Sequence, residues 1–335
     1  MASVLPSVRR TRAAVPVACF ALALAVALVL PAGARAAPTI DQQQPLMSTD
    51  IAYAVGGDSE EKFAQVITSG IAGLLTEVRV PLGCDSAASV TLEINNADTS
   101  PGGTTLARST FPGSAFPGPS GFMPMPLGTP PFIPAETQFA FILSATGSCG
   151  VIPGPVGDPY ARGNAYFDAR PNPAGIWVCQ CGFGNTPYDL AFQTLVERIC
   201  QVPNLVGTAG SDGAGTLGRY GCAAGTVTRA HSLAIAVGDV ISQGQPEGTR
   251  LPADSRVDFV VSLGKPPCRV PNVRGKTLAR ARSAIVRANC RLGAVHRVPS
   301  VNALKGRVIR QQPRAGSRRP YRARVRLVIG RGGRH

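Results

Sequence analysis

The sequence predicts an all-β sandwich of the jelly-roll kind, followed by two small α+β modules that each pack one helix on a three-stranded sheet. Three observations support this prediction. Glycine (38) and proline (30) make up about a fifth of the 335 residues, which is typical of short strands joined by turns. The last part of the chain repeats its own pattern. Hydrophobic residues at 44% and a mean hydropathy of +0.10 exclude a largely disordered chain.

Residues 1–37 have the layout of a secretory signal peptide. Three arginines precede an apolar run from Ala13 to Leu30, and Ala34-Arg35-Ala36 places small residues at the −3 and −1 positions of a cleavage site. An uncleaved anchor is the weaker alternative, because proline interrupts the run and a spanning helix needs about 20 apolar residues. We therefore expect a secreted protein with no transmembrane segment in the mature chain.

Eight cysteines follow the signal peptide, an even number that favours disulfides in an oxidising compartment. They are Cys84, Cys149, Cys179, Cys181, Cys200, Cys222, Cys268 and Cys290. Their spacings do not match the paired C-x-x-C ligands of a zinc site, so we predict no metal and no cofactor. Cys84 and Cys149 could join neighbouring strands. Cys179 and Cys181 could pair with each other in a strained loop, or instead with Cys84 and Cys149.

Residues 38–197 predict the sandwich, because short runs of alternating apolar residues are separated by turn residues. The strand candidates are 63–68, 75–82, 90–94, 139–143, 165–168, 176–180 and 188–192. The stretch from Pro101 to Pro134 holds nine prolines, so we expect a long surface loop there and no central strand. The layout from Gln65 to Phe192 resembles the jelly-roll domains of exported bacterial surface proteins, some of which are related to carbohydrate-binding modules.

The end of the chain contains two copies of one module, predicted over 198–265 and 266–335. Cys200-Gln201-Val202-Pro203-Asn204 aligns with Cys268-Arg269-Val270-Pro271-Asn272, and Val240-Ile241 and Gln243 align with Val308-Ile309 and Gln311. The simplest disulfide pairing joins the two cysteines within each copy. In the second copy, Thr277 can cap a helix whose stripe is Leu278, Ala281, Ile285 and Ala288, and strands are expected around 293–295, 306–311 and 323–329. Several glycines predict a shorter helix in the first copy.

These elements resemble the PASTA module of penicillin-binding proteins and bacterial serine/threonine kinases. The resemblance rests on Val-Pro-Asn-x-x-Gly, a helix, Gly-x-Val, Val-Ile-x-Gln, a Pro/Gly turn and a final strand ending at Gly264 or Gly330, and it covers 200–265 and 268–331. It implies a small α+β module that binds peptidoglycan fragments outside the cell or acts as a spacer. The paired cysteines, the glycine-rich first helix and the arginine load depart from the common pattern.

Charge separates the second copy from the rest of the protein. The chain from Cys268 onward has 19 Lys and Arg and no Asp or Glu, whereas the first 267 residues carry −4. We expect it to bind peptidoglycan or an anionic wall polymer through Arg280, Arg287, Arg291, Arg297 and Arg310. Nucleic acid is not expected, because the signal peptide exports the chain and Tyr321 is the only aromatic residue after Cys268. A compositional bias, with 30 Arg against 4 Lys, is the alternative explanation.

No catalytic site is predicted. All three histidines, His231, His296 and His335, follow the sandwich, so a histidine-assisted nucleophile has no base there. Asp158, Asp168, Asp189 and Glu136 could form a glycosidase pair or bind calcium, but acidic residues in loops are more often solvated. Four aromatic residues could form a sugar-stacking platform, namely Trp177, Tyr160, Tyr166 and Phe167, or Trp177 and Phe167 could belong to the core.

We therefore expect an exported, non-enzymatic, wall-associated protein whose tandem modules hold the sandwich at the cell surface. The alternative is a carbohydrate-binding or carbohydrate-active sandwich with the tail as a targeting device.

Overall fold

The computed structural model describes residues 37–58, 60–97, 100–119, 121–157, 159–168, 175–181 and 187–333. The predicted signal peptide therefore lies outside the described residues, except for Ala37. Within the described ranges, no helix has both the length and the apolar character to span a bilayer.

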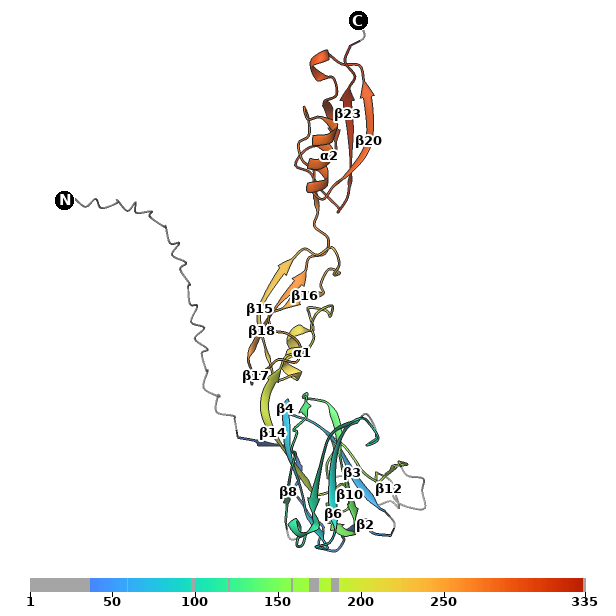
Figure 1. Ribbon diagram of the computed structural model, residues 1–335, viewed down its shortest axis with the longest axis vertical. Coiled ribbons are helices and arrows are strands. Elements are labelled where there is room, and N and C mark those ends of the chain that lie inside the picture. The colour runs from blue at the N-terminus through green and yellow to red at the C-terminus, as the bar shows by residue number, and fades with distance from the viewer. Residues whose placement is uncertain are drawn as a thin grey trace, which may run out of the picture. The chain divides into compact units, whose positions relative to one another are not determined.

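Two antiparallel sheets face each other in the N-terminal part of the chain (Figure 1). The first has the order β1 (Thr39–Gln44), β14 (Phe192–Gln201), β4 (Gly73–Val80) and β8 (Met123–Pro126), with β9 (Phe132–Ile133) also paired to β4. The second has the order β13 (Val178–Cys179), β12 (Ala165–Asp168), β3 (Lys62–Thr68), β10 (Gln138–Thr146), β6 (Ser89–Asn96) and β7 (Thr105–Pro112). A smaller sheet contains β2 (Tyr53–Gly56), β11 (Ser148–Val151) and β5 (Leu82–Cys84).

The core between the two sheets comes from the period-two alternation of their strands. On β6, Val90, Leu92 and Ile94 are fully buried, and Phe141 of β10 and Val78 of β4 belong to the same apolar cluster. This arrangement confirms the all-β prediction for the N-terminal part.

The prediction of a long surface loop between Pro101 and Pro134 is wrong. Strands β7, β8 and β9 all lie in this stretch. Strands β7 and β8 are the last strands of their sheets, and β8 carries Pro124 and Pro126. An edge strand bonds to a neighbour on one side only, so a residue without a backbone N–H is tolerated there. The prolines exclude a central strand, as expected, but not a strand.

Strand β14 crosses the predicted boundary between residues 197 and 198. The sequence predicts a strand over 188–192, whereas β14 begins at Phe192 and ends at Gln201. Its first part pairs with β1 and β4, and Ile199, Cys200 and Gln201 pair with β17 (Arg250–Pro252). One strand therefore contributes backbone hydrogen bonds to the sandwich and to the first module.

The two C-terminal modules share one topology. The first module (198–265) contains α1 (Gly213–Arg219), β15 (Ala223–Ala230), β16 (Val240–Gln243) and β18 (Arg256–Ser262). The second module (266–335) contains β19 (Cys268–Arg269), α2 (Leu278–Arg287), β20 (Arg291–Val298), β21 (Val308–Gln312), β22 (Arg318–Arg319) and β23 (Arg324–Gly330). In both, the central strand of a three-stranded sheet is parallel to one neighbour and antiparallel to the other. The second module also contains the short β19–β22 pair.

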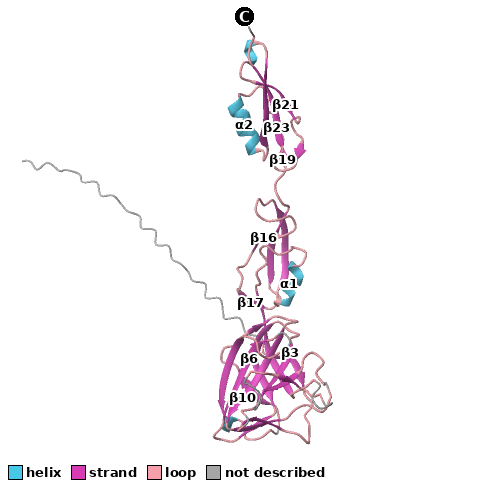
Figure 2. Cartoon of the chain, turned by 90° about the vertical axis from the view of Figure 1, so that its right-hand side faces the viewer, coloured by secondary structure: helices cyan, strands magenta, loops and turns pink. Residues whose placement is uncertain are grey.

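Helix α2 lies on one side of its sheet (Figure 2). The Thr277 hydroxyl accepts a hydrogen bond from the Arg280 N–H at 3.5 Å, and Ala281 and Ile285 are fully buried. Helix α1 has seven residues against ten in α2. The shorter helix agrees with the glycines in the first copy, each of which weakens a helix by about 1 kcal/mol relative to alanine.

A partly buried glutamine explains why Val-Ile-x-Gln recurs in both modules. The Gln311 carboxamide oxygen accepts from the Val273 N–H at 2.8 Å, and its nitrogen donates to the carbonyls of Pro271 at 2.9 Å and Pro313 at 3.4 Å. Gln243 makes the corresponding bonds to Leu205, Pro203 and Gln245. In each module the side chain joins the Val-Pro-Asn segment to the turn that follows the strand.

We expect Gln311→Ala to lower the free energy of unfolding of the second module by about 2 kcal/mol, because it removes three hydrogen bonds and leaves backbone groups unpaired. The neighbouring Gln312 is exposed, so Gln312→Ala is the matched control. Amide hydrogen exchange of β23 in the full chain measures both effects. Equal protection in the two variants would contradict this role of Gln311.

Four disulfides occur among the eight cysteines. Cys200 pairs with Cys222 and Cys268 with Cys290, the pairing that the repeat favours. The structure also decides between the alternatives left open for the sandwich. Cys84 pairs with Cys149 across the neighbouring strands β5 and β11, and Cys179 pairs with Cys181.

Candidate ligand-binding face of the second module

The sheet of the second module has one apolar and one basic face. Along β23, three apolar side chains are buried in one cluster with α2, namely Val325, Leu327 and Ile329. Arg324, which precedes them, and Arg326, which lies between the first two, are exposed. Successive side chains of a strand point to opposite faces, so the alternation in sequence produces the two faces directly. The exposed face is therefore basic.

A cavity of about 700 Å³ is formed at this face. Four arginines line it, together with His296 and three neutral polar residues; the arginines are Arg310, Arg314, Arg319 and Arg326, and the neutral residues are Gln311, Gln312 and Ser317. They come from β20, β21, the turn after β21, β22 and β23. A second hollow of about 640 Å³ is lined by Arg282, Arg291, Arg322 and Tyr321. Guanidinium groups gathered in this way suit phosphate or carboxylate ligands, which they bind in a bidentate manner.

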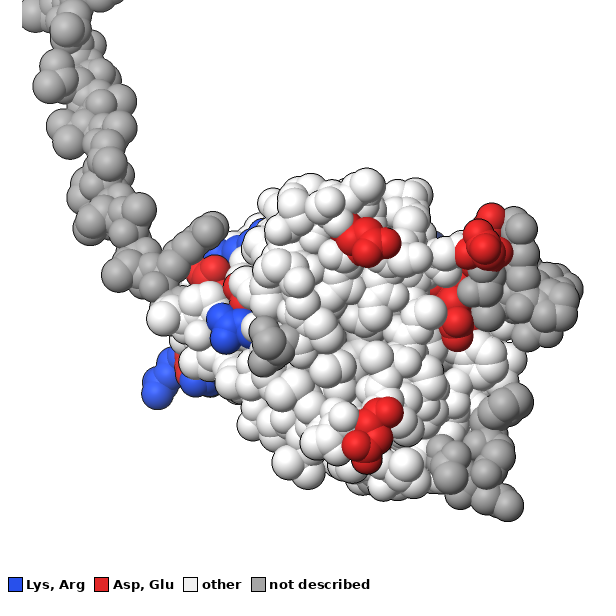
Figure 3. All heavy atoms as spheres, turned by 90° about the horizontal axis from the view of Figure 1, so that it is seen from below, with Lys and Arg blue, Asp and Glu red and all other residues white. Residues whose placement is uncertain are grey.

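These guanidinium groups have no carboxylate side chain of their own module to pair with. The last acidic residue of the sequence is Asp258, which belongs to the first module. The first module has six basic and five acidic residues. The sandwich face in Figure 3 likewise carries scattered Asp and Glu, with Lys and Arg at one edge. The second module is therefore the part of the chain that attracts polyanions.

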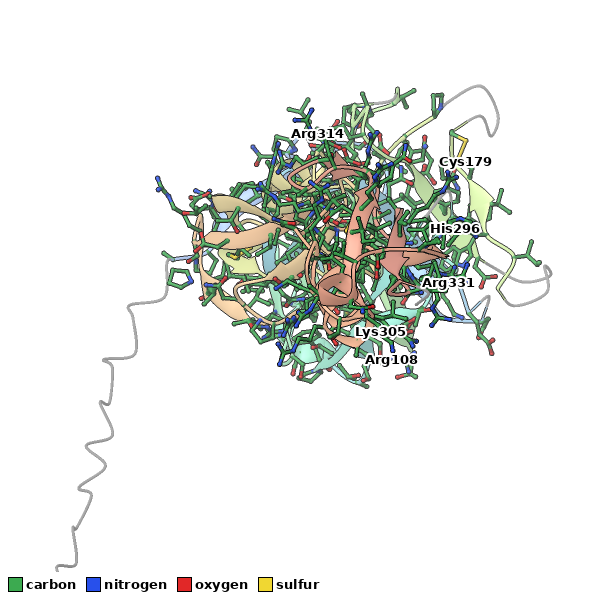
Figure 4. All side chains as sticks on the ribbon, turned by 90° about the horizontal axis from the view of Figure 1, so that it is seen from above. Arg108, Cys179, His296, Lys305, Arg314 and Arg331 are labelled. Carbon is green, nitrogen blue, oxygen red and sulfur yellow. A yellow bond between two sulfur atoms is a disulfide. The ribbon has the colours of Figure 1, made fainter. Side chains whose placement is uncertain are left out.

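The structure places the five predicted arginines at different points of this module. Arg310 lines the larger cavity and Arg291 the second hollow. Arg280 and Arg287 are exposed on α2 and line neither, and the same holds for Arg297 on β20. In Figure 4, Arg314 and Lys305 lie on different sides of the module.

The prediction missed Arg314, Arg319, Arg326 and His296 as cavity residues. The alternation Arg324-Val325-Arg326-Leu327 was a usable signal, because it assigns both arginines to the polar face. Arg314 and Arg319 lie in and after a turn, where periodicity says nothing about direction.

Tyr160 does not form a stacking platform, so that prediction is wrong. Its side chain is 6% exposed and packs edge-on against Phe192 in the sandwich core. Burial raises the pKa of its phenol, which donates to the Gln42 carboxamide oxygen at 3.0 Å. Trp177 is partly buried against a second apolar cluster that includes Tyr166. The two residues therefore belong to different layers of the sandwich.

The candidate carboxylates lie in separate environments. Glu136 pairs with Arg162 at 3.0 Å, whereas buried Asp189 accepts from the Gln65 side chain at 2.8 Å and the Tyr160 N–H at 3.1 Å. Asp158 lies outside the described residues. In the part of the chain that the structure describes, no group of three or more His, Cys, Asp or Glu side chains is placed to hold a metal ion.

Curated relatives resemble part of this chain. A probable serine/threonine-protein kinase of Clostridium acetobutylicum is 32% identical over 132 residues, which are 39% of this chain and 20% of the kinase. A probable serine/threonine-protein kinase of Corynebacterium efficiens is 29% identical over 150 residues, which are 44% of this chain and 23% of the kinase. The chain thus spans about a fifth of the length of the curated relatives it matches, and the similarity lies in the PASTA part.

Two solved structures come from a Ser/Thr kinase of Staphylococcus aureus. The three-PASTA-domain structure is 20% identical, with a TM-score of 0.31 over 40% of this chain and 67% of that chain. The entire extracellular region of PrkC is 20% identical, with a TM-score of 0.29 over 41% of this chain and 48% of that chain. The PASTA family profile matches residues 269–331, the stretch that contains α2, β20, β21 and β23. Residues 269–331 are a PASTA domain.

Proposed function

We propose that this chain is an exported, non-enzymatic protein in which the PASTA domain and the module before it hold the sandwich at the bacterial cell wall. One observation carries the proposal: a PASTA domain without a single Asp or Glu presents a cavity of about 700 Å³ lined by four arginines. The four disulfides support an extracellular location, because such bonds persist in oxidising compartments.

The arginine cavity favours an anionic wall polymer over a neutral peptidoglycan fragment. A neutral fragment would leave the four guanidinium groups without a counter-charge, whereas phosphates or carboxylates along a polymer neutralise them and release counterions. The absence of stacking aromatics other than Tyr321 in this module argues against single-stranded nucleic acid as the polymer.

Co-sedimentation with purified sacculi tests the proposal. Truncation between residues 197 and 198 would cut β14, so the full chain is compared with a chain that ends at Lys265, between β18 and β19. We expect the full chain to sediment at about 0.1 M salt and to be released at about 0.5 M, where screening shortens to a few ångströms. We expect much less of the truncated chain to sediment, because it keeps the first module but lacks the arginine cavity. Equal sedimentation of both chains would contradict the proposal.

A further inference from the structure

The outward face of the second sandwich sheet is covered, although alternation would leave it to solvent. Ala64 of β3, Ala140 and Ile142 of β10 and Tyr166 of β12 are buried there in an apolar cluster separate from the main core. Trp177 packs against this cluster. It is the only tryptophan of the chain.

Beside Trp177 this face is hollowed into a cavity of about 380 Å³. Its lining comes from seven separate elements or loops and is mainly polar. The side chains that matter below are Thr91, Glu93 and Asn95 of β6, Asp168 of β12 and Trp177. The volume is at the lower end of the ~300–1,000 Å³ range of small-molecule sites.

The two carboxylates of the cavity are held in place by the protein. Asp168 is 4% exposed and accepts from the Gly175 N–H at 2.9 Å, with the Lys62 ammonium at 3.9 Å. Glu93 accepts from the Thr105 hydroxyl and the Arg108 guanidinium, each at 2.9 Å. Burial alone would raise the pKa of Glu93, but these hydrogen bonds hold that pKa below its usual range. Both groups are therefore oriented acceptors.

Asn95 supplies an unused acceptor. The residue is 4% exposed, and its side-chain nitrogen donates to the Pro101 carbonyl at 3.0 Å. Its Oδ1 is buried and has no hydrogen-bond partner. A buried polar atom without a partner lowers stability, so Asn95, which lines this polar cavity, would gain a hydrogen bond if its amide turned Oδ1 toward a ligand that donates one.

We infer that this cavity binds a neutral sugar unit of a glycan. Sugar hydroxyls donate to carboxylate and amide oxygens, and the apolar face of a sugar ring matches the flat surface of an indole. Lys62 and Arg108 also line the cavity and balance the charges of Asp168 and Glu93, so the lining has no excess charge to attract an ionic ligand, which separates this site from the arginine cavity of the second module. The inference is independent of the proposed wall attachment.

Fluorescence of the full chain tests the inference directly, because Trp177 is its single tryptophan. The probes are neutral tetrasaccharides of glucose, N-acetylglucosamine, xylose, mannose or galactose. We expect at least one of them to change the tryptophan emission, with saturation at a concentration below about 10 mM, which corresponds to weak binding. Tetragalacturonate, the anionic comparator, should not do so. Failure of the whole neutral panel, or a response to the anionic sugar alone, overturns the inference.

Calorimetry on variants assigns the binding to this cavity. Trp177→Ala should weaken binding of the responding sugar by at least tenfold, and Trp177→Phe should restore part of it. Asn95→Leu, which removes the unused acceptor, should weaken binding about tenfold, the value of one hydrogen bond of about 1.4 kcal/mol. The neighbouring Ile176 is 53% exposed and does not line the cavity, so Ile176→Ala is the matched control and should bind normally. Circular dichroism checks the fold of each variant, and unchanged affinity in folded Trp177→Ala would place the sugar elsewhere.

Discussion

Replacing Arg310, Arg319 and Arg326 with glutamine should reduce binding of the full chain to linear polyphosphate by at least tenfold at about 0.1 M salt, because three cavity cations no longer neutralise phosphates. The logarithm of the binding constant should also depend less steeply on the logarithm of the salt concentration. If each arginine neutralises one phosphate, the slope should change by roughly two, as for single-stranded polyanions. Titration at several salt concentrations measures both quantities.

A variant with the same charge tests whether the cavity itself matters. Arg280, Arg287 and Lys305 are exposed and line neither arginine hollow, so replacing all three with glutamine removes the same charge from other surfaces of the module. We expect a clearly smaller loss of affinity. An equal loss in both triple variants would show that the polymer responds to the net charge of the module and not to the cavity.

Removal of the Cys268–Cys290 disulfide should lower the free energy of unfolding of the second module by roughly 3 kcal/mol, since the bond closes a loop across a sequence separation of 22. Both cysteines are buried in a small core, so the double substitution to alanine also removes packing. Hydrogen exchange of α2 and β23 measures the loss in the full chain.

The double substitution of Cys200 and Cys222 to alanine is the control for this effect. The two modules have separate apolar clusters, so this control should leave exchange in α2 and β23 unchanged. A loss below about 1 kcal/mol for the Cys268 and Cys290 variant would contradict the stabilising role of the loop closure.

Local patterns made the modules predictable. The signals that specify α2 all lie within about ten residues: Thr277 caps the helix, and Ala281 and Ile285 form its buried stripe. The repeat indicates which strands occur in both modules. The bounds of β14 and the presence of the edge strands β7 and β8 were harder to predict from the sequence. Their pairing depends on partners far away in sequence, and a run of proline and glycine does not reveal whether a segment borders a sheet.

The sites were predictable only in part. Composition identifies the second module as basic, and of the five arginines predicted to bind a ligand, Arg310 and Arg291 line hollows of this module. Whether another arginine lines the cavity depends on where the side chains of turn residues point, and sequence spacing does not define that direction. Tyr160 and Trp177 looked equivalent in sequence, but packing buries one in the main core and leaves the other beside a cavity.

Strand β14 also limits how this protein can be rearranged during evolution. Recombination that exchanges the first module alone would have to replace the end of β14 that pairs with β17, so we expect the sandwich and the first module to be inherited together. The segment between Ser262 and Cys268 contains no strand and is the natural junction for adding, losing or duplicating a terminal module. Homologues should therefore vary in the number of PASTA domains after this junction and not before it.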